Sequence, residues 1–273
     1  AKFYGCVTEG YSTVYLVQDL LDHNLGSTSF RDEIRTQTCS ESLALYLQMF
    51  MGAKDLWEVG FTHNDIKPEN MMADKYNKRA YLIDFGRAQL NTEYNKPLGT
   101  LIFMSPNKFR RGKPVKLIDD FYSIALSIAV VEAKGYYDDI FMKDGRSLPL
   151  TCVRMGMDSS CLAAMKENAR RVLKKAGYGD YISGSSKSTI NFTTLIAKLI
   201  GYQTFTFTPD EVIEIMNRLI KEHTAAKLLD EEEKAAIQKD REVRNQLRKA
   251  LKEDYQDEDE NFKRQPGLSK KIN

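Results

Sequence analysis

Four polar residues in two short segments have the types and the order that phosphoryl transfer requires. In the segment FTHNDIKPENMMAD, Asp65 can take the proton of an attacking hydroxyl, Lys67 can contact the transferred phosphate as a cation, and Asn70 offers a neutral oxygen to a metal ion. In the later run DFG, Asp84 offers the main carboxylate ligand for magnesium. A hairpin between Asn70 and Asp84 would bring the two ligands together, so we expect a magnesium site there.

A simpler interpretation is that each of these is an ordinary loop or core residue. For an isolated aspartate or histidine that interpretation would be preferred. Here the polar residues occur in a fixed order and spacing, and the pair Gly99-Thr100 follows them. The pattern therefore favours a phosphotransfer site.

The order H-x-D-x-K-x-x-N followed by D-F-G resembles the catalytic loop (residues 63–70 here) and the Asp-Phe-Gly turn (residues 84–86) of the eukaryotic protein kinase family. The resemblance is close over residues 1–135 and looser over 136–222. It implies an α+β, protein-kinase-like fold: a mainly helical large lobe with a short two-strand remnant of the small lobe. It also implies a kinase that uses ATP and magnesium to phosphorylate a protein substrate. Lys67 is the serine/threonine-kinase form of the loop.

The resemblance also implies supporting roles around the catalytic loop. His63 would pack under the Asp-Phe-Gly turn, and Asp120 would be the buried carboxylate that anchors the backbone of the loop. The segment PLGTLIFMSPNKF resembles the end of a kinase activation segment, which spans residues 84–106 here. The supporting residues implied in this way are His63, Phe85, Gly86, Thr100 and Asp120.

Two departures from the family pattern bear on regulation and stability. Asn64 stands where an arginine usually precedes the catalytic aspartate. We therefore expect no fixed receptor for a phosphate on Thr92 or Tyr94, and a constitutively shaped activation segment. Asn107 stands where a glutamate usually pairs with a distant arginine, so we expect a weakened anchor in the large lobe.

Within the kinase family, the chain most resembles the casein kinase 1 group, which includes the tau-tubulin and vaccinia-related kinases. The signals are the segments FYGC and VYLVQDLL near the start, the run Ser105-Pro106-Asn107 and the pair Asp119-Asp120. These signals are shorter than the catalytic-loop pattern and bear only on the subgroup.

The segment GYSTVYLV has two interpretations. It resembles the end of a glycine-rich phosphate loop, but such a loop should be followed by an Ala-x-Lys strand, and the next lysine is Lys54, inside an expected helix. We therefore interpret the segment as the last strand of the small lobe, leading into the hinge, with Gln18 as the gatekeeper. The adenine of ATP would then bond to the hinge backbone near Asp19 and Leu21, with Met72 as the floor of its pocket.

The sequence contains no glycine-rich loop, no ATP-anchoring strand lysine and no helix glutamate to pair with it. Since Ala1 is not an initiator methionine, we expect a fragment or a processed form of a kinase. A kinase-like binding module and a chain completed by a partner are the alternatives. A small-molecule phosphotransferase of the aminoglycoside or choline type is a further alternative, against which Lys67, the pair Gly99-Thr100 and Asp120 argue.

The composition is that of an ordinary globular protein: 42% of the residues are apolar, 29% are charged, and the net charge is +2. This balance points to neither nucleic acid nor a membrane as a partner. The longest apolar run, IALSIAVV, is too short to span a bilayer. Four cysteines without a C-x-x-C pair indicate free thiols and an intracellular location, cytoplasmic or nuclear.

The apolar pattern predicts helices over 41–59, 118–133, 158–176 and 209–222, and strands over 2–8, 12–18 and 80–84. We expect small-lobe strands and a hinge at 1–21, a kinase large lobe at 22–222 and a charged, helical or disordered tail at 223–273. Within the tail, residues 229–260 are either a solvated helix that frays or a helix that binds a partner through a thin apolar stripe. A partner covering the exposed hinge side is the other interaction we expect.

Overall fold

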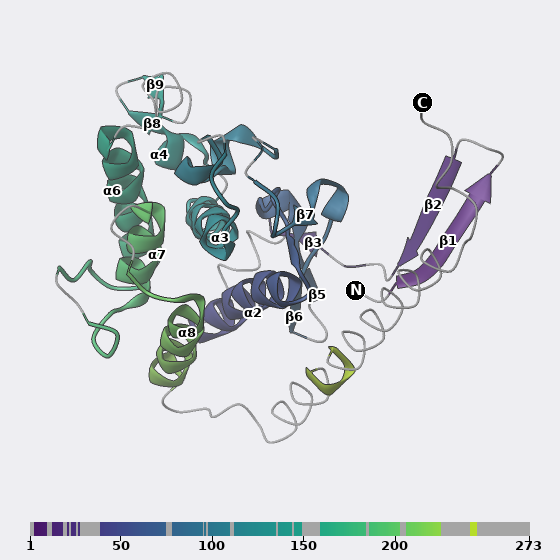
Figure 1. Ribbon diagram of the computed structural model, residues 1–273. Coiled ribbons are helices and arrows are strands. Elements are labelled where there is room, and N and C mark those ends of the chain that lie inside the picture. The colour runs from purple at the N-terminus through teal and green to yellow at the C-terminus, as the bar shows by residue number, and fades with distance from the viewer. Residues whose placement is uncertain are drawn as a thin grey trace. The chain divides into compact units, whose positions relative to one another are not determined.

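Helices make up most of the regular structure in the described part of the chain, and short antiparallel strand pairs flank the catalytic loop (Figure 1). The computed structural model describes residues 3–9, 13–18, 21, 23–25, 27, 39–74, 78–94, 96, 98–109, 112–134, 136–143, 145–148, 159–183, 186–202, 206–224 and 241–244. The chain divides into two units, residues 1–223 and 224–273.

Helix α2, Cys39–Glu58, forms because its apolar residues recur at intervals of three and four. The fully buried residues along its inner face are Leu43, Tyr46, Met49, Phe50 and Ala53. This face packs against helices α3 and α8. Beyond the helix, Gly60 has a φ of +97°, which favours glycine, and turns the chain into the catalytic loop. The predicted helix 41–59 is confirmed.

Helix α3, Leu117–Glu132, is buried along almost its whole length. A helix with apolar side chains on every side is stable only when other elements surround it. Phe121 contacts Phe50 of α2 edge to face, with ring centroids 5.0 Å apart. Helices α6 (Ser159–Lys175) and α7 (Phe192–Ile200) also pack against α3 (Figure 1). The predicted helices 118–133 and 158–176 are confirmed.

Helix α8, Pro209–His223, confirms the last predicted helix. It begins with a reciprocal cap of the kind that the sequence signals. The backbone N–H of Thr208 donates to Oε2 of Glu211 at 2.8 Å, and the N–H of Glu211 donates to Oγ1 of Thr208 at 3.2 Å. Lys54 of α2 reaches Asp210 at 3.3 Å, so the start of α8 is tied to α2.

Helix α7 is not among the predicted elements, although an asparagine, a common N-cap residue, stands at its start. The side chain of Asn191 caps it by accepting a hydrogen bond from the N–H of Thr194 at 2.9 Å. Among the described residues between α3 and α6, the regular elements are short: helix α4 at Asp138–Phe141 and the pair β8 (Met142–Lys143) and β9 (Arg146–Ser147).

Two strand pairs bring the catalytic loop beside the Asp-Phe-Gly turn. Strand β4, Phe61–Thr62, precedes the loop and pairs with β7, Gln89–Leu90, which follows the turn. Strand β5, Met71–Asp74, follows the loop and pairs with β6, Arg79–Leu82, which precedes the turn. The predicted hairpin between the two candidate metal ligands is therefore confirmed.

The first two predicted strands are confirmed and pair with each other. Strand β1, Phe3–Glu9, pairs antiparallel with β2, Thr13–Gln18. Asp19, which the hinge interpretation assigned to the adenine, lies outside the described residues. Strand β3, His23–Asn24, then joins β5 at the edge of a three-stranded sheet with the order β3-β5-β6. The chain after the expected hinge thus returns to the strand that carries Met72.

Little of the charged tail belongs to the described residues. Thr224 and the helical residues 241–244 are the part of the second unit that the structure describes. The expectations for the rest of 229–260 therefore stay predictions. In the described ranges, no helix combines the length and the apolar character that crossing a membrane requires.

Candidate active site

Asp120 of α3 fixes the backbone of the catalytic loop. Its side chain is 1% exposed and accepts three hydrogen bonds: from Oγ1 of Thr62 at 2.8 Å, from the N–H of His63 at 2.8 Å and from the N–H of Asn64 at 3.1 Å. Buried backbone N–H groups need acceptors, and a buried carboxylate needs donors. The N–H groups of the loop and the carboxylate of Asp120 therefore satisfy each other's hydrogen-bonding needs. The start of the loop is therefore held against the buried helix α3.

Asp65 follows directly and is held at both carboxylate oxygens. The N–H and Oγ1 of Thr100 donate to Oδ1 at 2.7 and 2.8 Å, and Nζ of Lys67 donates to Oδ2 at 3.3 Å. Burial alone would raise the pKa of Asp65, but the two hydrogen bonds from Thr100 and the nearby Lys67 ammonium outweigh it and lower the pKa below its usual value. Asp65 is therefore ionised at neutral pH.

Lys67 also donates to Oγ1 of Thr100, at 3.2 Å. The three side chains of Asp65, Lys67 and Thr100 thus form a closed set of hydrogen bonds. In this set a carboxylate and an ammonium lie side by side, which suits the transfer of a negatively charged group to a hydroxyl.

Gly99 explains how Thr100 comes so close to Asp65. Its φ is +108°, a conformation that side-chain-bearing residues rarely adopt. A Cβ atom at this position would lie 2.2 Å from the carbonyl oxygen of Asn64. Only glycine therefore lets the activation segment pass this close to the catalytic loop.

The two candidate metal ligands lie on adjoining segments. The backbone N–H of Ile83 donates to the carbonyl oxygen of Asn70 at 3.0 Å, which places the residue before Asp84 beside Asn70. Nδ2 of Asn70 donates to the carbonyl oxygen of Asp65 at 2.9 Å, which leaves the amide oxygen of Asn70 as the ligand atom. Asp84 is exposed, and its Oδ1 accepts from the N–H of Gly86 at 3.3 Å.

These ligands fit magnesium that is shared with a nucleotide. Among the described residues, no group of three or more His, Cys, Asp or Glu side chains gathers as a metal site. Mg²⁺ is commonly bound by one or two protein oxygens together with substrate phosphates and water, so a single carboxylate and an amide oxygen suffice. The fit therefore depends on a bound phosphate, so Asn70 and Asp84 are candidate ligands for a metal–nucleotide complex.

His63 lies beneath the Asp-Phe-Gly turn. It is fully buried, and its Nε2 lies 3.0 Å from the carbonyl oxygen of Ile83. Nδ1 is 3.4 Å from the N–H of Asp65, so the pairing assigns the ring proton to Nε2. The His63 ring centroid is 5.1 Å from that of Phe85, whose side chain is 52% exposed. His63 thus connects the catalytic loop to the turn.

The expected adenine site is only partly within the described residues. Met72 is half-buried in β5, where it pairs with Asn24 on one side and Tyr81 on the other. Leu21 is half-buried outside any regular element. The structure thus places Met72 next to the strand that follows the expected hinge.

The expected weak anchor at Asn107 is wrong. Nδ2 of Asn107 donates to Oδ2 of Asp119 at 3.0 Å and to the carbonyl oxygen of Pro114 at 3.2 Å. Asp119, which is fully buried, also accepts from Oγ of Ser105 at 2.5 Å and from the hydroxyl of Tyr202 at 2.8 Å. The carboxylate of this contact belongs to Asp119 of α3, and the activation segment supplies the amide and the hydroxyl. The sequence contains the pair Asp119-Asp120, but nothing in the sequence alone indicates this contact.

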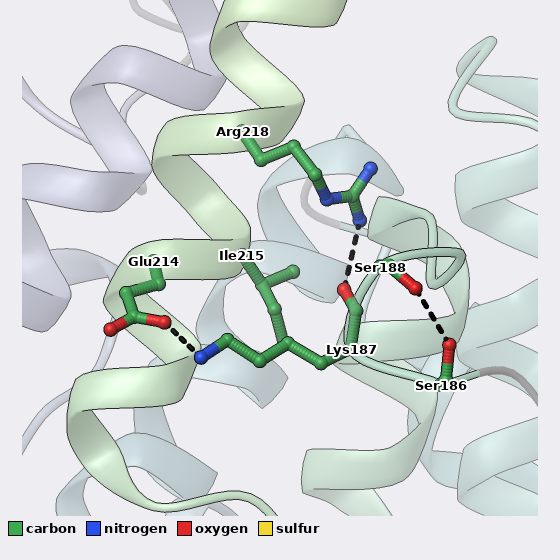
Figure 2. A pocket seen from close by; sticks show the side chains of 6 residues that line it. All are labelled: Ser186, Lys187, Ser188, Glu214, Ile215 and Arg218. Carbon is green, nitrogen blue, oxygen red and sulfur yellow. Dashed lines mark hydrogen bonds and ion pairs between the residues drawn. The ribbon is translucent and has the colours of Figure 1, made fainter.

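A hollow of about 440 Å³ lies beside helix α8 and is separate from the phosphotransfer residues (Figure 2). Its lining residues are Ser186, Lys187, Ser188, Glu214, Ile215 and Arg218. Figure 2 shows Lys187 directed at Glu214, with which it forms an ion pair. Arg218 pairs with Glu222 at 2.6 Å. Both cations of the hollow are therefore neutralised by the protein itself.

Among curated proteins, the chain is similar to serine/threonine-protein kinase 1 of African swine fever virus, with 26% identity over 157 residues that cover 54% of this chain and 52% of that protein. It is also similar to the negative regulator of sexual conjugation and meiosis of Schizosaccharomyces pombe, with 32% identity over 82 residues, 29% of this chain and 17% of that protein. The chain spans about half the length of the viral relatives it matches.

Two solved structures share the fold. The yeast RNA Pol II CTD kinase CTDK-1 complex matches with a TM-score of 0.53 and 18% identity, over 78% of this chain and 73% of the matched chain. The kinase PK-1 of Cydia pomonella granulovirus matches with a TM-score of 0.51 and 16% identity, over 78% and 72%. At these identities the similarity shows the fold alone, and it confirms the expected kinase-like fold.

Residues 1–174 match the family described as protein kinase domain, which is more than half of the 273 residues. The matched range contains the catalytic loop, the Asp-Phe-Gly turn, the activation segment and α3. The pattern of residues, the geometry and the family match agree: the chain belongs to the protein kinase domain family.

Proposed function

We propose that the chain carries the catalytic residues of a serine/threonine protein kinase, which transfers the γ-phosphate of Mg-ATP to a protein hydroxyl. One observation carries the proposal: Asp65 is held by Thr100 and Lys67, while the Asn70–Asp84 hairpin lies beside it. A base, a cation and two oxygen ligands in one place are what phosphoryl transfer uses.

In the proposed reaction, Asp65 orients the attacking hydroxyl and accepts its proton. Thr100 occupies Oδ1 of Asp65, so Oδ2, which contacts Lys67, is the oxygen left to receive the substrate hydroxyl. The Lys67 ammonium can turn from Asp65 towards the transferred phosphate as negative charge moves onto it. Asn70 and Asp84 would hold magnesium, which when bound neutralises the charge of the ATP phosphates.

We propose that the adenine lies between the hinge and β5, at Asp19, Leu21 and Met72. The half-buried side chain of Met72 and the pairing of β3 with β5 support this position. His63, Phe85, Gly86, Thr100 and Asp120 are proposed as supporting residues, on the contacts that they make around the loop and the turn.

Four finer assignments belong to the same proposal. The domain limits are proposed at 1–21, 22–222 and 223–273. The nearest subgroup is proposed to be casein kinase 1, supported by the link between the Ser105-Pro106-Asn107 run and α3. An intracellular location is proposed from the free thiols of Cys39 and Cys161. Besides the protein substrate, a partner is proposed to cover the hinge side or to bind 229–260.

Asp65→Asn tests the proposed function, because it keeps the shape of the side chain and removes the base. In the fullest available form of the protein, we expect transfer of radiolabelled γ-phosphate to serine and threonine peptides to fall by about 10²–10⁴-fold. Asp138→Asn, at an exposed carboxylate of α4, is the matched control. Unchanged transfer in a folded Asp65→Asn protein would contradict the assignment of Asp65 as the base.

A further inference from the structure

Lys108 is a lysine that the structure buries beside the catalytic loop. Its side chain is 2% exposed, although an ammonium without partners is costly to bury. Nζ donates a hydrogen bond to Oδ1 of Asn64, the residue immediately before Asp65. Within the described ranges, this is the one hydrogen-bond partner of the ammonium. The Lys108 ammonium, a group that usually reaches solvent, therefore donates to the neutral amide of Asn64.

Asn64 in turn connects three parts of the site. Its backbone N–H donates to Asp120 of α3 at 3.1 Å, and its Nδ2 donates to the carbonyl oxygen of Arg87 at 3.0 Å. Its φ of 67° is in the left-handed region, which asparagine tolerates better than most residues. Because the amide is held at its nitrogen by Arg87 and at its oxygen by Lys108, it cannot turn without breaking a buried contact.

Among the residues that the structure describes, the charge of Lys108 is balanced by carboxylates at a distance and by no direct ion pair. Burial lowers the pKa of Lys108, while the carboxylates of Asp120, Asp119 and Asp65 raise it and reduce the effect. Each of these three carboxylates accepts hydrogen bonds from other residues. The hydrogen bond of the ammonium is thus directed at the Asn64 amide, which is the contact that sets the geometry next to Asp65.

We propose that Lys108 is a positioning residue for phosphoryl transfer and acts through Asn64. It fixes the Asn64 amide, which ties the first turn of the activation segment, at Arg87, to the peptide before Asp65. The connection needs no phosphate group on the activation segment. The kinetic part of this inference rests on the proposed kinase function, whereas the contacts can be tested without any activity.

Lys108→Met removes the ammonium and keeps an unbranched side chain. Lys113→Met, at an exposed lysine of the same stretch, is the matched control. For both variants, in the fullest available form of the protein, three quantities are measured: the midpoint of thermal unfolding, kcat with KM for ATP, and the rate of hydrogen–deuterium exchange in peptides covering 84–90.

We expect Lys108→Met to unfold at the same or a higher temperature, because the substitution removes a buried charge. We expect its kcat to fall about tenfold or more, with KM for ATP changed by less than about twofold, since misplacing a base slows the chemical step. Peptides covering 84–90 should exchange faster, because Arg87 loses a fixed partner. Lys113→Met should change none of these quantities.

A double-mutant cycle tests whether Lys108 acts through Asn64. Asn64→Gly removes the amide and keeps the left-handed backbone accessible. If the two residues form one unit, the double variant has the same kcat as Asn64→Gly alone. Losses that multiply would show independent action and overturn the inference.

The outcomes separate this inference from the proposed function. If the unmodified protein shows no transfer that depends on Asp65, the proposed function fails, and the inference is then judged by hydrogen–deuterium exchange over 84–90 alone. Faster exchange in Lys108→Met supports the inference. Unchanged exchange in that variant overturns it. If the unmodified protein is active, an unchanged kcat in Lys108→Met overturns the inference. A fall in kcat that accompanies a lower unfolding temperature also overturns it, since Lys108 would then only stabilise the fold.

Discussion

Asp119 and Asp120 are consecutive residues of α3, and they hold two different loops. Asp120 accepts hydrogen bonds from the start of the catalytic loop, whereas Asp119 accepts them from Ser105 and Asn107 at the end of the activation segment. Both carboxylates are buried, so each contact is made away from water, where it is strong. One turn of helix therefore sets the spacing between the two loops that meet at Asp65.

Asp120→Asn should destabilise the protein, because one carboxylate oxygen becomes an N–H₂ group that faces a backbone or hydroxyl donor. Leaving such groups unpaired in the interior costs about 2–4 kcal/mol of unfolding free energy. Urea denaturation is the measurement. Asp138→Asn, on the surface, should change the unfolding free energy by less than about 0.5 kcal/mol. Equal stabilities of the two variants would contradict the anchoring role of Asp120.

Gly99→Ala should abolish most phosphotransfer, because the new Cβ would lie 2.2 Å from the carbonyl oxygen of Asn64 and must push Thr100 away from Asp65. Gly112→Ala is the matched control. Gly112 also has a positive φ, +73°, but nothing lies within 4 Å of the Cβ position. The control should lose about 1 kcal/mol of stability from backbone strain alone and keep its turnover. The measurements are turnover and the midpoint of unfolding for both variants. Similar losses of turnover at both glycines would contradict the requirement for a close approach at Gly99.

Glu132 should make stability depend on pH. It is half-buried at the end of α3, and this burial raises its pKa above the usual value of 4.5, although the hydroxyls of Tyr46 and Tyr178 donate to it at 2.6 and 2.7 Å and oppose the shift. The folded state therefore keeps the proton of Glu132 after the unfolded state has released it. The stability contribution is fully present below pH 4.5 and is lost as pH rises through the folded pKa.

Glu132→Gln should remove that dependence, because the glutamine oxygen can accept the same two hydroxyl hydrogen bonds and carries no titrating proton. Urea denaturation from pH 4.5 upwards is the measurement. In the unmodified protein, Glu132 can contribute a slope of up to about −1.4 kcal/mol per pH unit. The same slope in Glu132→Gln would assign the pH dependence to other groups.

The 273 residues alone should bind Mg-ATP weakly. Met72, Asn70 and Asp84 are proposed to supply part of the site, but the sequence contains no strand lysine and no glycine-rich cover for the phosphates. Each lost charge-assisted contact costs about 1.5–3 kcal/mol, or about ten- to 150-fold in affinity. Isothermal titration with ATP and Mg²⁺ measures the affinity directly. A low-micromolar dissociation constant would mean that other residues, or a second copy, replace the missing contacts.

The parts of the fold that local sequence determines could be predicted. The apolar periodicity of α2, α3, α6 and α8 is visible within each segment, because one buried face imposes it. The catalytic loop and the hairpin that follows it were also predictable, since their residues lie close together in sequence. Helix α7 was missed, although Asn191 is an ordinary capping residue, because its apolar run is short.

The contacts that join distant segments could not be predicted. Lys108 follows Asn107 in a stretch that reads as polar, and its burial depends on Asn64, which lies 44 residues earlier. The expectation of a weak anchor at Asn107 failed because the family pattern places the charge in the activation segment. Here the charge is at Asp119, and only the packing of α3 shows that the two positions meet.

The pairing of β4 with β7 and of β5 with β6 also has a consequence for folding. Both strand pairs join residues within 61–90, so these pairings are local in sequence and carry a small loop-closure cost, although Thr100 and Asp120 bind the loop from outside this stretch. We expect the two strand pairs to behave as one cooperative folding unit. The amides of Ile83 and Asn91, which donate to Asn70 and Gly60, should open with one common free energy. The residues proposed for the chemistry between 65 and 84 would then be gained or lost together.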